Sequence, residues 1–221
     1  MNKRIVVFDF DKTLTYKDTL FGFYLSLSHY DLRSFCNVIR YLLLVLLYKF
    51  NLIDNSTLKY YGFHYFIRGK SEIELTKAAT KYASKIKFNA LYQSFNFLAD
   101  DLSVVIISAS YQIYLRPLFP HQVKVYGSNF SFNQGKAYQF RVNCYAEVKR
   151  EILNSNGILN IDTFYTDSIS DYCLASMSKK IRLVNKDNII DFSNIEDFRL
   201  YFVTNSRWKR FVSLLRSMLK K

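Results

Sequence analysis

The sequence predicts an α/β fold, in which a parallel β-sheet carries helices on both faces and is interrupted by an inserted α-helical block. Apolar, β-branched runs at about 4–9, 103–108, 163–166 and 181–184 alternate with helical patterns, as the strands of a parallel sheet do. Polar side chains directly follow three of these runs. The segment from about 19 to 101 has helical periodicity and no convincing strand.

Size and charge limit the classes of protein that the chain can belong to. The 221 residues fit one α/β domain with a sizeable insertion, or two small domains. A formal net charge of +13 favours an anionic partner, such as nucleic acid, a phospholipid surface or a phosphorylated substrate, unless it reflects general surface basicity. Because no signature of a nucleic-acid module is present, we expect no nucleic-acid partner. Nothing in the sequence sets the oligomeric state.

Cysteine usage and hydropathy predict a cytoplasmic protein. The three cysteines, Cys36, Cys144 and Cys173, have no metal-ligand or disulfide spacing. The apolar run after Arg4 is too short for a signal peptide. The most apolar stretch, 41–48, would extend only about 12 Å as a helix, too short for a bilayer core of roughly 30 Å. We expect it to be a buried or interfacial helix.

The expected elements run in order along the chain. After the first strand, Ser71 and Glu74 form a capping box that opens one helix of the inserted block. The sheet resumes at 103–108 and a third strand is expected at 123–126. The sequence Asn133-Gln134-Gly135 predicts a hairpin within 130–142. The remaining elements are a helix over 144–156 that ends at Gly157, a strand at 163–166, a short helix over 169–178 and a last strand at 181–184.

Two aspartates, Asp9 and Asp11, follow the first strand. Residues two apart in a strand point to the same face, so the two carboxylates would repel each other unless positive charge lies nearby. A divalent metal suits oxygen ligands of this kind. The alternative is a strand that ends in a polar turn, where Asp is common.

Further polar groups follow the other strands and favour phosphoryl transfer. Ser108 ends the second strand, Asp167 and Asp171 follow the 163–166 strand, and Lys149 lies early in the preceding helix. In a parallel sheet these strand ends meet at one edge, where ligands bind. A carboxylate can attack phosphorus, and a second can protonate the leaving oxygen and then activate water. Magnesium, Ser and Lys would stabilise the phosphoryl oxygens.

Four segments in this order resemble the motifs of the haloacid dehalogenase (HAD) superfamily, and most closely its phosphoserine-phosphatase-like subfamily IB. The motif-like segments are Asp9-Phe10-Asp11-Lys12-Thr13-Leu14-Thr15, Ser108-Ala109-Ser110 with Tyr114-Leu115-Arg116-Pro117, Cys144-Tyr145-Ala146-Glu147-Val148-Lys149, and Tyr165-Thr166-Asp167-Ser168-Ile169-Ser170-Asp171. The resemblance implies a Rossmann-like core domain at 1–16 and 96–221, with a helical cap at 17–95. Because Asp11 is present, it implies a phosphatase rather than a dehalogenase.

The resemblance also implies a role for each matching residue. Asp9 would be the nucleophile and Asp11 the general acid/base. Magnesium would be held by Asp9, the main-chain carbonyl of Asp11, and Asp167. Phosphoryl oxygens would be held by Thr13, Ser108, Ala109 and Lys149, with Ser168 and Asp171 in support.

Two positions depart from the family pattern, which usually has glycine where this chain has Lys12 and Ala146. If the glycine serves a positive φ, a side chain at Lys12 costs about 1 kcal/mol. Lys is tolerated at this position in many family members, so the departure does not argue against activity.

The predicted cap is rich in apolar residues, including the 42–47 run, Phe50, Tyr60 and Tyr61. We expect most of them to be core, although they offer more apolar surface than a small cap needs. Acidic residues that could bind a substrate amine are scarce, which disfavours phosphoserine. We therefore expect an apolar or lipid phosphate as substrate.

The C-terminal segment places Trp208, Phe211 and Leu215 on one helical face, surrounded by basic residues. This pattern fits either contact with an anionic membrane surface or packing against the sheet.

Three other functions remain open at this point. A phosphotransferase would pass the phosphoryl group to an alcohol rather than to water. A small-metabolite phosphatase would act on a phosphoserine-like substrate. A basic, membrane-peripheral binding module would keep the fold without catalysis, although it would have no need for Asp11, Lys149, Asp167 and Asp171 together.

Overall fold

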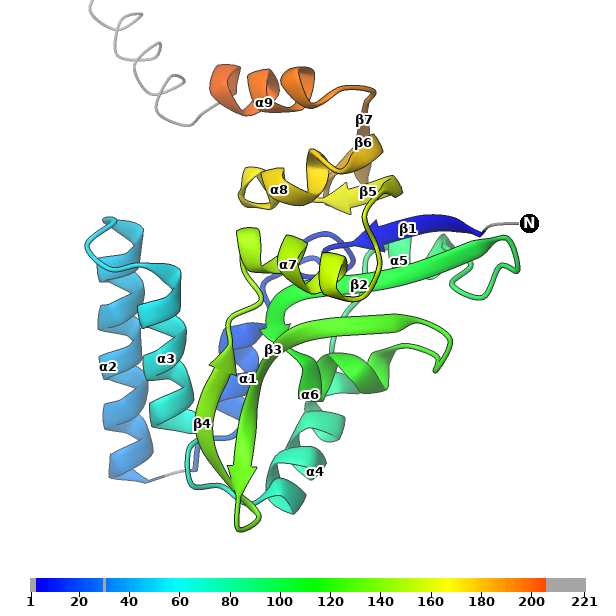
Figure 1. Cartoon of the computed structure of the whole chain (residues 1–221). Helices are drawn as coiled ribbons and strands as arrows, with labels where there is room; N and C mark the ends of the chain where they lie inside the picture. The colour runs from blue at the N-terminus through cyan, green and yellow to red at the C-terminus, as the bar shows by residue number, and fades with distance from the viewer. Residues whose placement is uncertain (1–2, 30, 206–221) are drawn as a thin grey trace, which may run out of the picture.

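The structure is a computed structural model that describes residues 3–29 and 31–205. Seven strands in this part of the chain form one sheet of order β4-β3-β2-β1-β5-β6-β7 (Figure 1). The inner strands pair in parallel and the two outermost pairs, β3–β4 and β6–β7, are antiparallel. The strands are β1 (Arg4–Phe8), β2 (Leu102–Tyr111), β3 (Lys124–Asn133), β4 (Lys136–Val142), β5 (Ile161–Thr166), β6 (Ser178–Asn185) and β7 (Asn188–Phe192). The predicted Rossmann-like α/β fold is confirmed.

Alternate residues of the central strand pack on opposite faces of the sheet. Val7 belongs to a buried cluster with Leu153, Leu174 and Phe198, which come from helices on one face. Val6 belongs to the cluster on the other face. The helices on the Val7 side are α7 (Glu147–Ser155), α8 (Tyr172–Ala175) and α9 (Ile195–Thr204). Because both faces are covered, β1 is apolar from Ile5 to its end at Phe8, and the next polar side chain comes after the strand, at Asp9.

A helical block connects β1 to β2. Its helices are α1 (Leu20–Ser26), α2 (Leu32–Lys49), α3 (Asn55–Phe66), α4 (Glu72–Ala83) and α5 (Ala90–Ser94). Side chains cap four of them, at Asp31, Asp54, Ser71 and Asn89. Of the predicted capping box, the Ser71 half is present, since its hydroxyl accepts a hydrogen bond of 3.2 Å from the Glu74 N–H. The Glu74 side chain instead accepts from Lys70 Nζ at 2.7 Å.

The helical block packs against the hairpin of β3 and β4 as well as against the sheet. The Gly69 N–H donates to the Ala137 carbonyl at 2.8 Å, and the Phe63 ring lies 5.6 Å from that of Phe130. One buried cluster joins residues of the block, such as Phe66, to residues of the sheet, such as Ile106. The division into a core at 1–16 and 96–221 and a cap at 17–95 stays a prediction.

Several element predictions need correction in detail. The third strand continues from 124 to 133 as the first arm of the predicted hairpin. The turn has positive φ at Gln134 (48°) and Gly135 (70°), as a type I′ turn requires. The strand at 181–184 is not the last, because β7 follows it after a turn in which Lys186 has φ 59°. The predicted helix over 169–178 is a 3₁₀ turn, Ile169–Asp171, followed by α8. In the segment after β2, α6 (Gln112–Leu115) leads into a 3₁₀ turn, Arg116–Leu118.

The expectation that most apolar residues of the helical block are core is wrong for its outer part. Side chains of α2 and its surroundings that are exposed include Leu42, Leu43, Leu46, Leu47, Phe50, Tyr60 and Tyr61. Apolar periodicity could not reveal this, because α2 is apolar on nearly every side and only tertiary packing decides which side is covered. Among the described helices, none has both the length and the apolar character needed to cross a bilayer. The predicted C-terminal helix lies outside the described residues.

Both positions at which the family usually has glycine have positive φ, 61° at Lys12 and 48° at Ala146. Ala146 is also the residue before α7, and its ψ of −124° lies outside the left-handed helical region. A Cβ in such a conformation costs roughly 1–2 kcal/mol. Both residues lie in the segments that carry the predicted site.

Ala146→Gly should therefore stabilise the folded protein. Relief of the strain outweighs the greater chain entropy of glycine, so we expect the free energy of unfolding to rise by about 0.5–1 kcal/mol. Urea denaturation measures the change. Ala78→Gly, in the middle of α4, is the matched control and should lower stability by a similar amount. A loss of stability in Ala146→Gly would contradict the account of this backbone position.

Candidate active site

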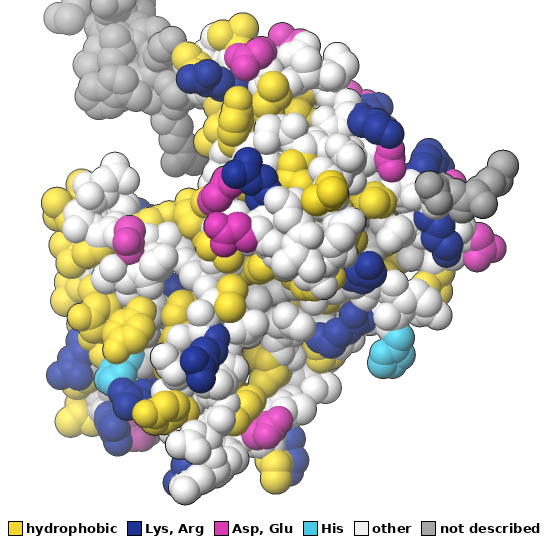
Figure 2. Space-filling view, viewed as in Figure 1, with side chains coloured by type: hydrophobic (Ala, Val, Ile, Leu, Met, Phe, Trp, Pro, Cys, Tyr) yellow, Lys and Arg dark blue, Asp and Glu magenta, His cyan; other side chains and the backbone are white. Residues whose placement is uncertain are grey.

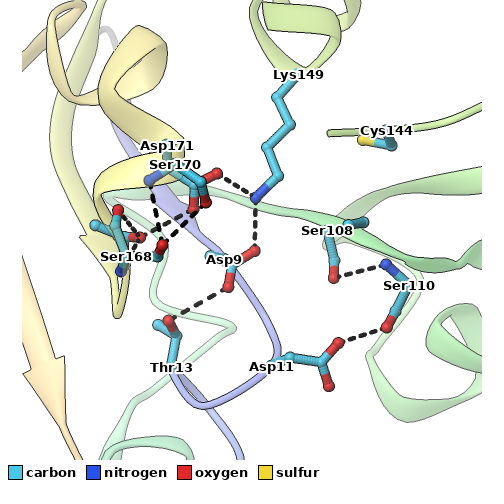
Figure 3. A network of polar contacts seen from close by, with 12 residues as sticks. Asp9, Asp11, Thr13, Ser108, Ser110, Cys144, Lys149, Ser168, Ser170 and Asp171 are labelled. Atoms are coloured by element: carbon cyan, nitrogen blue, oxygen red, sulfur yellow. Dashed lines mark hydrogen bonds and ion pairs between the residues drawn. The ribbon is translucent and has the colours of Figure 1, made fainter. Parts of the chain in front are cut away.

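A cavity of about 550 Å³ opens at the carboxyl ends of β1, β2 and β5. Eight of the nine predicted site residues line it, namely Asp9, Asp11, Ser108, Ala109, Lys149, Asp167, Ser168 and Asp171. The ninth, Thr13, is buried beside Asp9, and its hydroxyl lies 3.5 Å from Asp9 Oδ2. The fold thus brings the four motif-like segments together at one edge of the sheet (Figure 3).

Lys149 joins two of the carboxylates. Its Nζ donates to Asp9 Oδ1 at 2.7 Å and to Asp171 Oδ1 at 2.6 Å, and all three side chains are almost completely buried. Burial alone would lower the pKa of Lys149, but the charges of Asp171 and Asp9 outweigh it and raise the pKa. Lys149 is therefore a fixed cation that holds the Asp9 side chain from the α7 side of the cavity (Figure 3).

The Asp9 carboxylate has one oxygen in this ion pair, whereas its second oxygen lies outside it and has a long contact to Thr13. Its position is set by the sheet, since the Asp9 N–H donates to the Tyr165 carbonyl of β5 at 2.9 Å. Burial raises the pKa of Asp9 to about 6, although Lys149 acts in the opposite direction. Asp9 is thus mainly ionised at neutral pH.

Asp11 points away from Asp9, toward Ser110 near the end of β2 (Figure 3). Its Oδ1 accepts from the Thr19 N–H at 2.7 Å and from the Thr19 hydroxyl at 2.6 Å, and its Oδ2 accepts from the Ser110 hydroxyl. Burial and the charge of Asp18 raise the pKa of Asp11 to about 7. The two aspartates after one strand therefore have different partners and different proton affinities.

The segment Ser108–Ser110 forms a β-bulge at the end of β2. The pairing of β2 with β3 shifts between Ile107 and Tyr111, and a bulge of this kind re-aims side chains. The Ser110 N–H donates to the Ser108 hydroxyl at 3.1 Å. β3 approaches closely at Gly127, where a Cβ would lie 2.6 Å from the Ser110 carbonyl oxygen. The bulge therefore requires a glycine on the neighbouring strand.

The turn after β5 supplies the remaining carboxylates. The Thr166 hydroxyl donates to Asp171 Oδ2 at 2.9 Å, which orients Asp171 toward Lys149. The Ser168 hydroxyl accepts from the Ser170 N–H at 3.1 Å and so shapes the same turn. Asp167 faces the cavity, and burial together with the charge of Asp9 raises its pKa to about 7.

The carboxylates of the cavity meet only part of what a hard divalent cation such as magnesium needs. Among residues 3–29 and 31–205, no three His, Cys, Asp or Glu side chains are grouped so that they could hold a metal ion. The Asp11 side chain accepts hydrogen bonds from Thr19 and Ser110 and is directed away from a cation bound at Asp9. The charge of Asp9, however, raises the pKa of Asp167 across the cavity. A cation between these two carboxylates would offset that repulsion, so they fit the oxygen ligands of magnesium.

Lys59 is a site residue that the sequence analysis missed. It is buried in α3, lines the cavity, and donates to the Ala109 carbonyl and, at 3.2 Å, to the Ser128 hydroxyl. Burial lowers its pKa to about 8. The sequence did contain a signal, because Lys59 shares helical spacing with the buried residues Gly62, Phe63 and Phe66. A lysine on the apolar stripe of a helix indicates a buried, partnered cation.

Thr19 and Ser110 were also missed as partners of Asp11. Thr19 is the residue before α1, and its hydroxyl also lies 2.9 Å from that of Tyr114. No sequence pattern links residues 8 and 99 positions from Asp11 to its carboxylate. These contacts arise only when α1 and the β2 bulge fold over the end of β1.

The architecture is that of a Rossmann-like α/β protein whose polar groups gather at the carboxyl ends of the parallel strands. The chain belongs to the haloacid dehalogenase-like hydrolase family, whose model matches residues 6–176. The predicted family is thereby confirmed. No curated protein sequence matches the chain.

Solved structures share the fold at low sequence identity. A protein of unknown function from Bordetella pertussis Tohama I is 14% identical, with a TM-score of 0.61 over 79% of this chain and 86% of that one. A phosphoserine phosphatase from T. onnurineus in complex with NDSB-201 is 15% identical, with a TM-score of 0.54 over 92% and 96%. Cytosolic 5'-nucleotidase IIIB bound to cytidine is 20% identical, with a TM-score of 0.52 over 79% and 69%.

The raised carboxyl pKa values predict how pH affects stability in the absence of divalent cations. At about pH 5 the folded protein keeps protons on Asp9, Asp11 and Asp167, which the unfolded chain has mostly released. The free energy of unfolding should therefore fall as pH rises from about 5 to about 8. Asp11→Asn removes one such group, so it should exceed the parent protein in stability at pH 8 by about 1 kcal/mol or more.

Urea denaturation in EDTA across this pH range measures both effects. Asp100→Asn, at an exposed position, is the matched control and should leave the pH dependence unchanged. An Asp11→Asn protein whose stability falls as steeply with pH as that of the parent would show that Asp11 is not the titrating group.

Proposed function

We propose that the protein is a magnesium-dependent phosphomonoesterase that acts through an aspartyl-phosphate intermediate. The observation that carries the proposal is that Asp9 and Asp11 have different hydrogen-bond and ion-pair partners. Asp9 is held by a cation and keeps one oxygen outside the ion pair, whereas Asp11 is held by hydroxyl and amide donors and has the higher pKa. A nucleophile must be ionised, and a general acid must hold a proton near neutral pH.

In this proposal Asp9 Oδ2 attacks the phosphorus atom of the bound monoester. A new bond forms between Oδ2 and phosphorus while the bond from phosphorus to the ester oxygen breaks. Asp11 gives its proton to the departing oxygen, which leaves as an alcohol. Lys149 keeps Asp9 in the attacking orientation through its contact to Oδ1.

The second step returns both aspartates to their starting state. Asp11, now ionised, accepts a proton from a water molecule whose oxygen attacks the phosphorus of the intermediate. The bond to Asp9 Oδ2 breaks, and inorganic phosphate leaves. Magnesium, bound by Asp9 and Asp167 with the main-chain carbonyl of Asp11, would supply positive charge that offsets the phosphoryl oxygens.

The phosphoryl oxygens need donors that are fixed before the reaction. We assign this role to Thr13, Ser108, the backbone at Ala109, and Lys149. The β-bulge supports the assignment of Ser108, because it directs that hydroxyl into the cavity where Asp9 lies. Ser168 and Asp171 act through the turn after β5 and through Lys149.

The cavity supports an apolar or lipid phosphate as substrate. Its wall away from Asp9 is formed by side chains of the helical block, which include Phe21, Tyr41, Leu42, Val45 and Leu58. Such a wall favours an acyl or alkyl chain next to the phosphate. We accordingly propose a cytoplasmic enzyme with peripheral contact to anionic membranes.

A second candidate is a small-metabolite phosphatase. Asp18 and Lys59 line the same cavity and together offer a carboxylate and an ammonium group to a zwitterionic phosphomonoester. Although acidic residues are scarce in the helical block, Asp18 is placed where it could bind a substrate amine. A phosphotransferase remains a third candidate, and added acceptor alcohols distinguish it by the product formed.

The central test is Asp9→Asn. We expect loss of about 1,000-fold or more in kcat/KM for an aryl phosphate, because the amide cannot act as the nucleophile. Asp11→Asn should lose about 100-fold or more. Asp100→Asn is the control and should retain full turnover, while circular dichroism checks that each variant is folded. Undiminished, metal-independent turnover in Asp9→Asn would refute the mechanism.

The substrate prediction compares an alkyl phosphate with phosphoserine. We expect kcat/KM to favour the alkyl phosphate by about tenfold or more, since its chain is buried against the apolar wall. Asp18→Asn lowers the pKa of Asp11 and so should affect turnover of both substrates alike, leaving the preference for the alkyl phosphate in place. A preference for phosphoserine that disappears in Asp18→Asn would instead establish the second candidate.

A further inference from the structure

The outer face of α2 is apolar along the whole helix. We define this face by Leu32, Phe35, Ile39, Leu43, Leu46 and Phe50, which follow one another at steps of three or four residues. At 3.6 residues per turn they lie within an arc of about 80°. All six are exposed, from 43% at Ile39 to 77% at Leu32. Figure 2 shows hydrophobic side chains along the edge of the molecule where α2 lies in Figure 1.

The opposite side of α2 already has its partners. Tyr41 is buried, and Val38 and Val45 pack against the main apolar cluster. α2 is therefore apolar both toward the protein and toward its surroundings. A helix of this kind at a protein surface indicates contact with another apolar phase or molecule.

The charge of α2 distinguishes between two possible partners of the outer face, a second copy of this chain and a lipid bilayer. α2 contains Arg33, Arg40 and Lys49 and no acidic residue between 32 and 49. A second copy would bring the same basic residues against this helix and would add to the repulsion between two chains of formal charge +13. Anionic lipid headgroups would attract these residues while the apolar face enters the boundary of the acyl chains.

The same helix connects its outer face to the cavity. Leu42, which is 44% exposed beside the outer face, also lines the cavity with Val45, Tyr48 and Lys49. A molecule that leaves a membrane surface along α2 would therefore meet apolar side chains from the bilayer to the site. We propose that α2 docks the protein on an anionic phospholipid bilayer through its outer face, with the cavity opening toward that surface.

Vesicle flotation of the full chain tests this proposal. The vesicles contain phosphatidylglycerol and phosphatidylcholine in equal amounts, and vesicles of phosphatidylcholine alone serve as the neutral comparison. We expect the parent protein to float with the anionic vesicles, and salt to weaken binding without abolishing it. The double substitution Leu43→Gln/Leu46→Gln should lower partition by about tenfold or more.

The matched control makes the same change at two exposed apolar residues elsewhere. Ile73→Gln/Leu200→Gln alters side chains that are 70% and 57% exposed, on α4 and α9, and should float like the parent protein. Leu43 and Leu46 do not line the cavity, so turnover of a soluble aryl phosphate should be unchanged in Leu43→Gln/Leu46→Gln. Such turnover also shows that this variant is folded.

Two results would overturn the proposal. One is flotation of Leu43→Gln/Leu46→Gln equal to that of the parent, which would place membrane binding on another surface. The other is that the parent protein does not float with anionic vesicles at low salt. If the parent is then a dimer that Leu43→Gln/Leu46→Gln dissociates, the outer face binds a second copy of the chain instead of a membrane. Flotation needs no catalysis, so docking and the proposed function can fail separately.

Discussion

The site depends on the buried ion pairs of Lys149. One ammonium group joins Asp9 at the end of β1 to Asp171 after β5, and it comes from α7, which packs on one face of the sheet. A buried charge without a partner is strongly destabilising, so Asp9 and Asp171 both require Lys149, and Lys149 requires at least one of them. These contacts connect segments that are 140 and 22 residues apart. They fix the orientation of the Asp9 carboxylate before any ligand is bound.

Around this centre the chain repeatedly tolerates unfavourable local geometry. Lys12 and Ala146 adopt positive φ, β2 bulges at Ser108–Ser110, and Gly127 allows β3 to approach the bulge. Asp11 and Asp167 are kept where burial raises their pKa. Strain and poorly solvated charge of this kind concentrate at functional sites, because the surrounding core stabilises them.

Much of the fold could be predicted from the sequence, because the features concerned are local. Strands covered on both faces must be continuous apolar runs, and their first polar residues mark the edge of the sheet. Asp9, Ser108 and Asp167 were found in this way, and Lys149 was found from its place early in the helix before the 163–166 strand. The hairpin turn at Gln134 and Gly135 was equally local, since it depends on two residues that accept positive φ.

Other features could not be predicted, because distant contacts decide them. The direction of the Asp11 side chain depends on Thr19 and on Ser110, which reach it only after α1 and the β2 bulge have folded. The role of Lys59 depends on Ala109 and Ser128. For α2, apolar residues on both sides gave no indication of which side the protein covers. The short, exposed strand β7 lacks the apolar run that marked the inner strands.

The central claim is that Asp9 carries the phosphoryl group during turnover. The most direct measurement is mass spectrometry of the Asp11→Asn protein, quenched with acid during reaction with an aryl phosphate and magnesium. This variant should hydrolyse the intermediate slowly, so it should accumulate it. The account predicts one phosphoryl group on the peptide that contains Asp9 and none in Asp9→Asn. A phosphoryl group on another residue, or turnover with no covalent species in any quenched sample, would contradict it.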